Sequence, residues 1–225
     1  MTKLLLSIML YGLELRAQGT PRPFVRAAGQ ASVFLPPDQV KVDATVVSQA
    51  ATAQDAAAQN ANQVAAVTAA LQKLLGATAD IKTINYYVTP VYKNAPGGGP
   101  ATIVGYTASL TVEVTLGAVS MAGAVIDTAA AAGATSIGSL QFSLKDPEPA
   151  RLQALRMATV QAKNHADAMA GGLGHTTGAI LSLQESSTVN VPVVGVGAAP
   201  SGGATQITPG LIEVQGHVVI QTELN

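Results

Sequence analysis

Apolar and polar positions alternate along several segments of this chain, which is the pattern of a β-strand with one buried face. In the simplest case the apolar positions are Val40, Val42, Ala44 and Val46. The same alternation runs through 106–115 and 212–221, and β-branched and aromatic residues are concentrated in 81–92. With further runs at 25–34, 136–144 and 178–190, the pattern predicts seven strands.

Three other segments repeat apolar residues at the helical spacing of three or four. The first runs from Thr52, a favourable N-cap residue, to Gly76, and the second from about 118 to 132. The third begins at Asp146-Pro147-Glu148, where Asp caps the helix and Pro takes its first position. The expected buried stripes are Val64, Val67, Leu71 and Leu74 in the first helix, Val119, Ala122, Ile126 and Ala129 in the second, and Leu155, Thr159, Ala162, Ala166, Met169 and Leu173 in the third.

The order of these segments predicts an α+β fold, in which three main helices cover one face of a largely antiparallel sheet. Pro36-Pro37-Asp38 separates the first two strands and predicts a hairpin there. Loops rich in Gly and Pro, near 94–100 and 192–208, are expected to be a hairpin tip and a long loop or interaction arm. The glycine run at 97–99 leads into a strand and not into a helix, so it does not have the arrangement of a phosphate-binding loop.

The first 19 residues have the organisation of a secretory signal peptide. Lys3 precedes a short apolar run at 4–13, and cleavage is expected after Gly19 or after Ala17. The run is shorter than the roughly 20 apolar residues that span a bilayer, so a retained membrane helix is the weaker interpretation. We therefore expect a signal peptide, 1–19, and one domain, 20–225, that is periplasmic or associated with the outer membrane.

Composition excludes several classes of function. The chain has no Cys, so disulfides and thiol catalysis are both excluded. Without residues 1–19, ten basic and twelve acidic residues remain, a formal charge of −2. Such a chain has no polycationic face, and its aromatic content of 4% offers little base stacking, so nucleic acid is not an expected partner. Membrane contact is expected to be peripheral at most.

No group of side chains in the sequence carries an evident reaction. His165, His175 and His217 are the only histidines, and none has a carboxylate or second histidine at metal-ligand spacing. Helix capping explains Asp146 and Glu148, and Ser201 lacks the glycine-flanked elbow of a catalytic serine. We therefore expect a non-enzymatic protein without catalytic, metal-binding or cofactor-binding residues.

Four tyrosines stand near the first Gly-rich loop and concentrate the aromatic content of the chain there. They are Tyr86, Tyr87, Tyr92 and Tyr106. Two interpretations stay open at this point: packing between neighbouring strands, or anchors of an interface with a partner.

Motifs distributed along the chain resemble one known family. They are Gly29-Gln30-Ala31-Ser32-Val33 with Pro37-Asp38, residues 56–60 and 71–76, Ile81, Thr83, Pro90, Tyr92, Gly105-Tyr106, Ile126-Asp127, Gly133-Ala134, Phe142, and the helix 151–173 with its Gly172-Leu173-Gly174 end. These residues resemble the SIMPL domain, also called DUF541. The resemblance implies exported or envelope-associated bacterial proteins, some described as periplasmic immunogenic proteins, some linked to oxidative-stress defence, and at least one a ring-shaped homo-oligomer. It brings no catalytic residues with it.

The leading hypothesis is a periplasmic SIMPL-like protein that forms a homo-oligomer through exposed strand edges or hairpin tips and contributes to the envelope or to stress tolerance. The alternative is a module that binds a small molecule or a peptide between its helices and its sheet, although the sequence identifies no ligand. An envelope hydrolase would require the histidines or acidic residues to converge in the fold.

Overall fold

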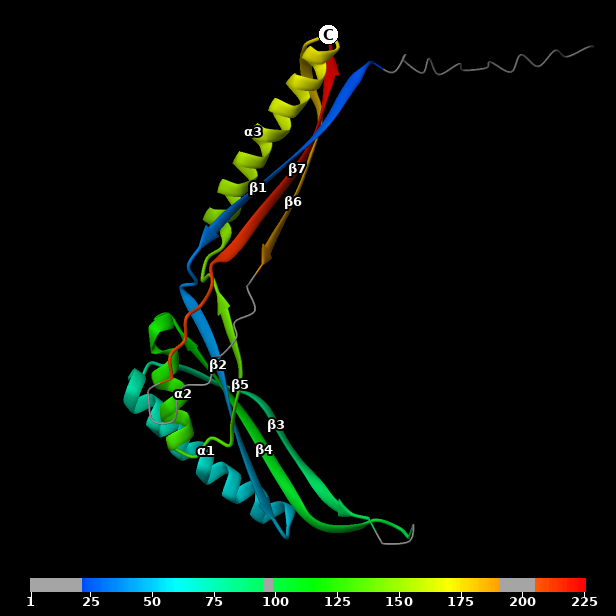
Figure 1. Cartoon of the computed structure of the whole chain (residues 1–225). Helices are drawn as coiled ribbons and strands as arrows, with labels where there is room; N and C mark the ends of the chain where they lie inside the picture. Colours follow the sequence, from blue (N-terminus) through cyan, green and yellow to red (C-terminus); the bar gives the residue numbers. More distant parts are fainter. Residues whose placement is uncertain (1–21, 95–98, 191–204) are drawn as a thin grey trace, which may run out of the picture.

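The computed structural model describes residues 22–94, 99–190 and 205–225 (Figure 1). The expected signal peptide, Ser201 and most of both Gly-rich loops therefore lie outside the described residues. The strands are β1 (Phe24–Leu35), β2 (Gln39–Ala50), β3 (Asp80–Lys93), β4 (Thr102–Leu116), β5 (Ser136–Ser143), β6 (Thr177–Asn190) and β7 (Ile212–Leu224). The helices are α1 (Ala53–Leu75), α2 (Ala122–Ala131), which follows a short 3-10 turn at Val119–Met121, and α3 (Glu148–Gly172). The predicted α+β class, strands and helices are thus confirmed.

The strands form two antiparallel sheets (Figure 1). Sheet A has the order β1-β7-β6, and α3 lies on one of its faces, over β1 and β7. Sheet B has the order β3-β4-β2-β5 and is covered on one face by α1 and α2. Each sheet therefore has a helical layer and a face without one. No helix in the described part of the chain is long and apolar enough to cross a membrane.

The hairpin predicted between the first two strands is wrong. β1 pairs with β7 along its whole length, whereas β2 pairs with β4 and β5. The chain passes from one sheet to the other through Pro36-Pro37 without reversing (Figure 1). Two consecutive prolines fix φ and remove two backbone N–H donors. These properties are compatible with an extended link as well as with a turn, so the prolines alone do not predict a hairpin. The Asp38 carboxylate then accepts a hydrogen bond from the Lys145 backbone N–H at 2.6 Å, and so ties this link to the segment before α3.

Sheet B and its helices enclose the larger apolar core. The inward side of β2 is fully buried against Val67 and Leu71 of α1 and Val125 of α2. The predicted caps of α1 are confirmed, because Thr52 Oγ1 accepts from the Asp55 N–H and Gly76 ends the helix with a φ of 94°. The predicted stripe is wrong at Leu74, which is exposed, because Leu75 is the residue that packs against the core.

A buried amide joins α1 to this core. Asn60 of α1 is fully buried, and its Nδ2 donates to the carbonyl oxygens of Val46 at 2.8 Å and Ala108 at 3.2 Å. These carbonyls belong to the neighbouring strands β2 and β4. A single amide thus ties α1 to both strands and favours one position of the helix over the sheet.

Sheet A packs on α3 through small residues. The buried side of the helix is Ala150, Ala154, Ala158, Ala162, Ala166 and Ala170. Gly29 of β1 and Gly216 of β7 lie against this stripe, and a Cβ atom at either position would overlap the α3 backbone. The stripe predicted for this helix is confirmed at Ala162 and Ala166, and Leu155 is partly buried against the same core. It is wrong at Met169 and Leu173, which are exposed. The backbones approach so closely that larger side chains are displaced to the flanks of the helix.

Candidate functional site

The structure does not gather the three histidines. His165 Nδ1 lies 2.8 Å from the carbonyl oxygen of Ala28, and His175 Nδ1 lies 3.0 Å from that of Asn225. His217 is on β7, on the face of sheet A away from α3. The described residues contain no group of three or more His, Asp or Glu side chains that is arranged to hold a metal ion.

The acidic pair singled out at the start of the third helix binds within this end of the helix, although α3 begins at Glu148 and Pro147 takes the N-cap position instead of the first helical position predicted for it. Asp146 Oδ1 accepts from the Glu148 N–H at 3.1 Å, which caps the first turn. Glu148 Oε2 accepts from Arg151 Nε at 2.9 Å, and this hydrogen bond, with the charge of Glu148, raises the pKa of Arg151. Both carboxylates are therefore occupied by α3 itself.

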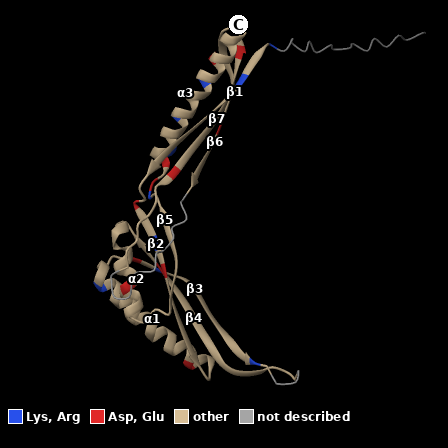
Figure 2. Ribbon diagram, viewed as in Figure 1, with Lys and Arg blue, Asp and Glu red and all other residues tan. Residues whose placement is uncertain are grey.

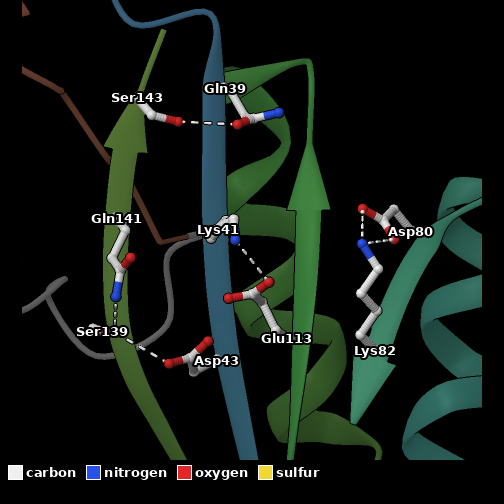
Figure 3. A network of polar contacts seen from close by, with 9 residues as sticks. All are labelled: Gln39, Lys41, Asp43, Asp80, Lys82, Glu113, Ser139, Gln141 and Ser143. Carbon is white, nitrogen blue, oxygen red and sulfur yellow. Dashed lines mark hydrogen bonds and ion pairs between the residues drawn. The ribbon is translucent and has the colours of Figure 1, made fainter. Parts of the chain in front are cut away.

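The outer face of sheet B is polar, and its side chains bind one another (Figure 3). Lys41 Nζ lies 3.0 Å from Glu113 Oε1, and Ser139 Oγ donates to Asp43 Oδ2 at 3.2 Å. At the edge of the sheet, Lys82 binds Asp80 and lowers the pKa of that carboxyl group. This is the arrangement of a solvated sheet face, on which neighbouring side chains bind one another.

The edges of the sheets differ in how they are protected. On β1, α3 covers the free edge, because Gln161 Oε1 accepts from the Gln30 N–H at 2.6 Å and His165 binds the Ala28 carbonyl. β5 has only eight residues, and β3 carries Pro90, Lys82 and two irregularities in its pairing. Short strands, proline, lysine and bulges all hinder the pairing of an edge with another chain.

β6 lacks most of these protections, and we call its outer side the β6 edge. It is a 14-residue strand that, within the described part of the chain, pairs only with β7. The pairing has two irregularities between Thr177 and Ser182 and is regular from Ser182 to Asn190. Its large apolar side chains are 42% to 58% exposed, and they are Ile180, Leu181, Leu183 and Val189. Leu183 and Val189 lie on the face that α3 covers over β1 and β7, opposite Ile220 and Val214. Arg151 of α3 reaches Glu185 and Ser187 between them, but both apolar side chains stay exposed.

A second exposed surface is the hairpin of β3 and β4, which carries the four tyrosines. Tyr86, Tyr87 and Tyr92 are about half exposed, whereas Tyr106 is half buried opposite Pro90 and Ala50. The structure thus places three of the four predicted aromatic residues on the surface, which favours the interpretation as interface anchors over packing for these three.

Two shallow cavities lie on sheet B. One of about 440 Å³ is formed where α1 and β4 end, and its lining includes Leu74, Leu75, Leu116, Met121 and Asp80. The other, of about 250 Å³, lies at the base of the tyrosine hairpin between Ala50, Val91, Val104 and Tyr106. The first is mostly apolar with one carboxylate at its rim.

Asp127 has a contact that the sequence did not indicate. Its carboxylate accepts from the Thr205 N–H at 3.1 Å and from Thr205 Oγ1 at 2.6 Å, and these bonds lower its pKa. Gly123 of α2 lies against the carbonyl of Thr205, and Ile207 packs on the core of sheet B. The segment 205–211, which leads into β7, is therefore held on α2.

Comparison with known proteins gives a consistent result. A family model described as SIMPL, protein of unknown function (DUF541), matches residues 25–222. The uncharacterized protein YggE of Edwardsiella ictaluri is 31% identical over 162 residues, which cover 72% of this chain and 67% of that protein. The 26 kDa periplasmic immunogenic protein of Brucella melitensis is 25% identical over 176 residues, with 75% and 69% covered. YggE of Escherichia coli K12 is 28% identical over 174 residues, with 77% and 70% covered. The chain therefore belongs to the SIMPL (DUF541) family.

Proposed function

We propose that this protein is a non-enzymatic component of the bacterial envelope that assembles with copies of itself through the β6 edge, with a role in envelope maintenance or stress tolerance. Its placement in the periplasm is supported by the name of the Brucella relative and by the signal-like residues 1–19. The β6 edge is the observation that carries the assembly.

The β6 edge can contribute both backbone hydrogen bonds and apolar burial to a contact with a strand of another copy. An outer strand presents unpaired N–H and C=O groups, and a strand from a second copy would satisfy them. The same strand would cover Leu183 and Val189, and full burial of such a side chain contributes about 1.5 to 3 kcal/mol. Glu185 is the only charged residue of β6, and Arg151 lies 3.5 Å from it, so charge repulsion between copies is small.

The test is the mass of the purified protein by light scattering after size exclusion, over a series of concentrations. We expect a discrete oligomer that persists on dilution. Leu183→Lys places a charge in the contact and should shift the mass to that of the monomer. The control is Val160→Lys on the outer side of α3, where the side chain is 61% exposed and the charge change is the same. A monomer at every concentration, or an unchanged mass for Leu183→Lys, would contradict the proposal.

The alternative function, binding of a small molecule or peptide, is favoured by the 440 Å³ cavity, whose size lies in the range of ligand sites. A screen of small apolar ligands by thermal shift tests it. A ligand of this cavity should raise the melting temperature of the protein, and Met121→Lys, which changes the lining, should abolish that increase. The absence of any stabilising ligand would leave assembly as the better proposal.

A further inference from the structure

β3 and β4 continue beyond the end of β2 as a two-stranded ribbon. Ala50, the last residue of β2, pairs with Tyr106, so none of the described strands lies beside residues 91–93 and 102–105 as a third strand. We call these residues the ribbon end. Its large side chains Tyr92, Ile103 and Val104 are each more than half exposed. Figure 1 shows the ribbon projecting past α1, at the opposite end of the molecule from sheet A.

The charge of the ribbon has one sign. Between residues 83 and 93 and between residues 102 and 112, Lys93 is the only Lys, Arg, Asp or Glu. The next charged residues toward the body of the protein, Lys82 and Glu113, are each in an ion pair. Figure 2 shows how sparse charged residues are along this part of the molecule. Such a surface, with exposed apolar groups, one cation and no anion of its own, is complementary to the interface of an anionic membrane, where charged headgroups meet acyl chains.

The exposed apolar groups of the ribbon end come from both of its strands. They are Tyr92 of β3 and Ile103 and Val104 of β4, and Tyr92 pairs with Ile103. A folded partner would cover one face of such a ribbon, whereas a lipid headgroup layer surrounds an inserted end on all sides. Tyrosine suits that layer because its ring is apolar and its hydroxyl is polar.

We propose that the ribbon end is a docking surface for the headgroup layer of an anionic phospholipid membrane. Tyr92, Ile103 and Val104 enter the boundary between headgroups and acyl chains, and Lys93 binds lipid phosphate. The inward backbone groups of β3 and β4 pair with one another, and those on the two outer edges stay in the hydrated headgroup layer, where water and headgroups bind them, so the insertion is shallow. The contact is peripheral and reversible, because one short ribbon inserts few side chains. It does not depend on assembly through the β6 edge, although several copies would strengthen it.

Flotation of the full protein with vesicles tests this surface. The vesicles contain phosphatidylethanolamine with phosphatidylglycerol, and vesicles of phosphatidylcholine alone serve for comparison. We expect flotation with the anionic vesicles and weaker flotation at high salt. The double variant Tyr92→Ser with Ile103→Ser should lose about tenfold or more in partitioning, and Lys93→Gln about fivefold. The control is Tyr86→Ser, on the same strand but about 20 Å from Tyr92 at the usual rise per residue.

Four results would overturn the proposal. The first three are wild-type protein that does not float with anionic vesicles, flotation that is the same for the double variant, and an equal loss in Tyr86→Ser. A fourth is a double variant whose oligomer mass falls in light scattering, because the ribbon end would then contact a second copy. Mass and flotation are separate measurements, so failure of the β6 edge and failure of the ribbon end are distinguishable.

Discussion

At the scale of single residues, α3 lies very close to sheet A because the residues between them have little or no side chain. Gly29 and Gly216 have no Cβ, and the alanines of α3 have no atoms beyond it, so helix and sheet backbones meet directly. Each alanine buries little apolar area, but many short contacts between close-packed backbones contribute dispersion energy together. The stability of sheet A therefore depends on small side chains.

Gly29→Ala tests this dependence. The new methyl group would overlap the carbonyl oxygen of Ala158 and the backbone nitrogen of Ala162. Both are backbone atoms, which cannot move away as a flexible side chain could. We expect a loss of about 1 to 3 kcal/mol in the free energy of unfolding, measured with urea. The control is Gly171→Ala near the end of α3, where a Cβ meets nothing within 4 Å, and where stability should rise by up to about 1 kcal/mol. Equal urea midpoints for the two variants would contradict this account of the packing.

This contact also shows why the sequence misplaced the buried side of α3. A search for apolar periodicity ranks Leu155, Met169 and Leu173 above alanine, but burial depends on how near the sheet lies, which no local pattern records. One signal was present, since alanine recurs at every fourth position from Ala150 to Ala170. A four-residue step advances about 40° around the helix, so this stripe winds along the helix as a twisted sheet requires.

At the scale of elements, the strands were predictable and their partners were not. Alternation is a property of neighbouring residues, so it located β2, β4 and β7 correctly. Pairing is a property of the whole chain, and β1 finds its partner in β7, almost at the other end of the sequence. The same holds for the candidate surfaces. The tyrosines of β3 could be identified in the sequence, whereas the β6 edge can be identified only once the strand order is known.

Two leucines of α1 that differ in burial test the position of this helix on sheet B. Leu71 is fully buried in the core of sheet B, whereas Leu74 is 37% exposed and lies outside that core. We expect Leu71→Ala to cost about 2 to 5 kcal/mol in the free energy of unfolding, because it removes buried methyl groups and leaves a cavity. Leu74→Ala should change the urea midpoint little. Similar effects of the two substitutions would mean that α1 is rotated relative to the described position.

The start of α3 gives a second test at this scale. Asp146→Ala removes the oxygen that accepts from the Glu148 N–H, and such a loss costs about 1 kcal/mol. Asp146→Asn keeps a side-chain oxygen in the same place and should retain most of the stability. If both variants unfold at the same urea concentration as the wild type, the cap does not contribute to the stability of the helix.

At the scale of the whole molecule, sheet A and sheet B are connected by more than the Pro36-Pro37 link. The segment 205–211 lies on α2, beside sheet B, and continues as β7, the central strand of sheet A. Asp127 holds this segment through two hydrogen bonds from Thr205, and Ile207 adds an apolar contact. The family-like motif Ile126-Asp127 thus has a structural explanation, since its acidic residue anchors the chain between the two halves.

This anchor predicts a pH dependence whose sign follows from the pKa of Asp127. The bonds from Thr205 favour the ionised carboxylate, so the pKa in the folded protein is lower than in the unfolded chain, where it is about 3.9. The anchor therefore stabilises the fold fully above the unfolded pKa, and this stabilisation is lost as the pH falls through the folded pKa. Asp127→Asn cannot ionise, so the stability difference between wild type and variant should be largest near neutral pH and should shrink below about pH 4.

Urea unfolding of wild type and Asp127→Asn over a pH series measures this difference directly. Thr205→Val, which removes the hydroxyl donor at similar volume, should weaken the same pH dependence from the other partner. Hydrogen exchange distinguishes loss of the anchor from general destabilisation, because residues 205–211 should exchange faster in both variants while α3 is unchanged. A stability difference that stays constant with pH would show that Asp127 does not hold this segment as a carboxylate, and that the apolar contact of Ile207 keeps it on α2.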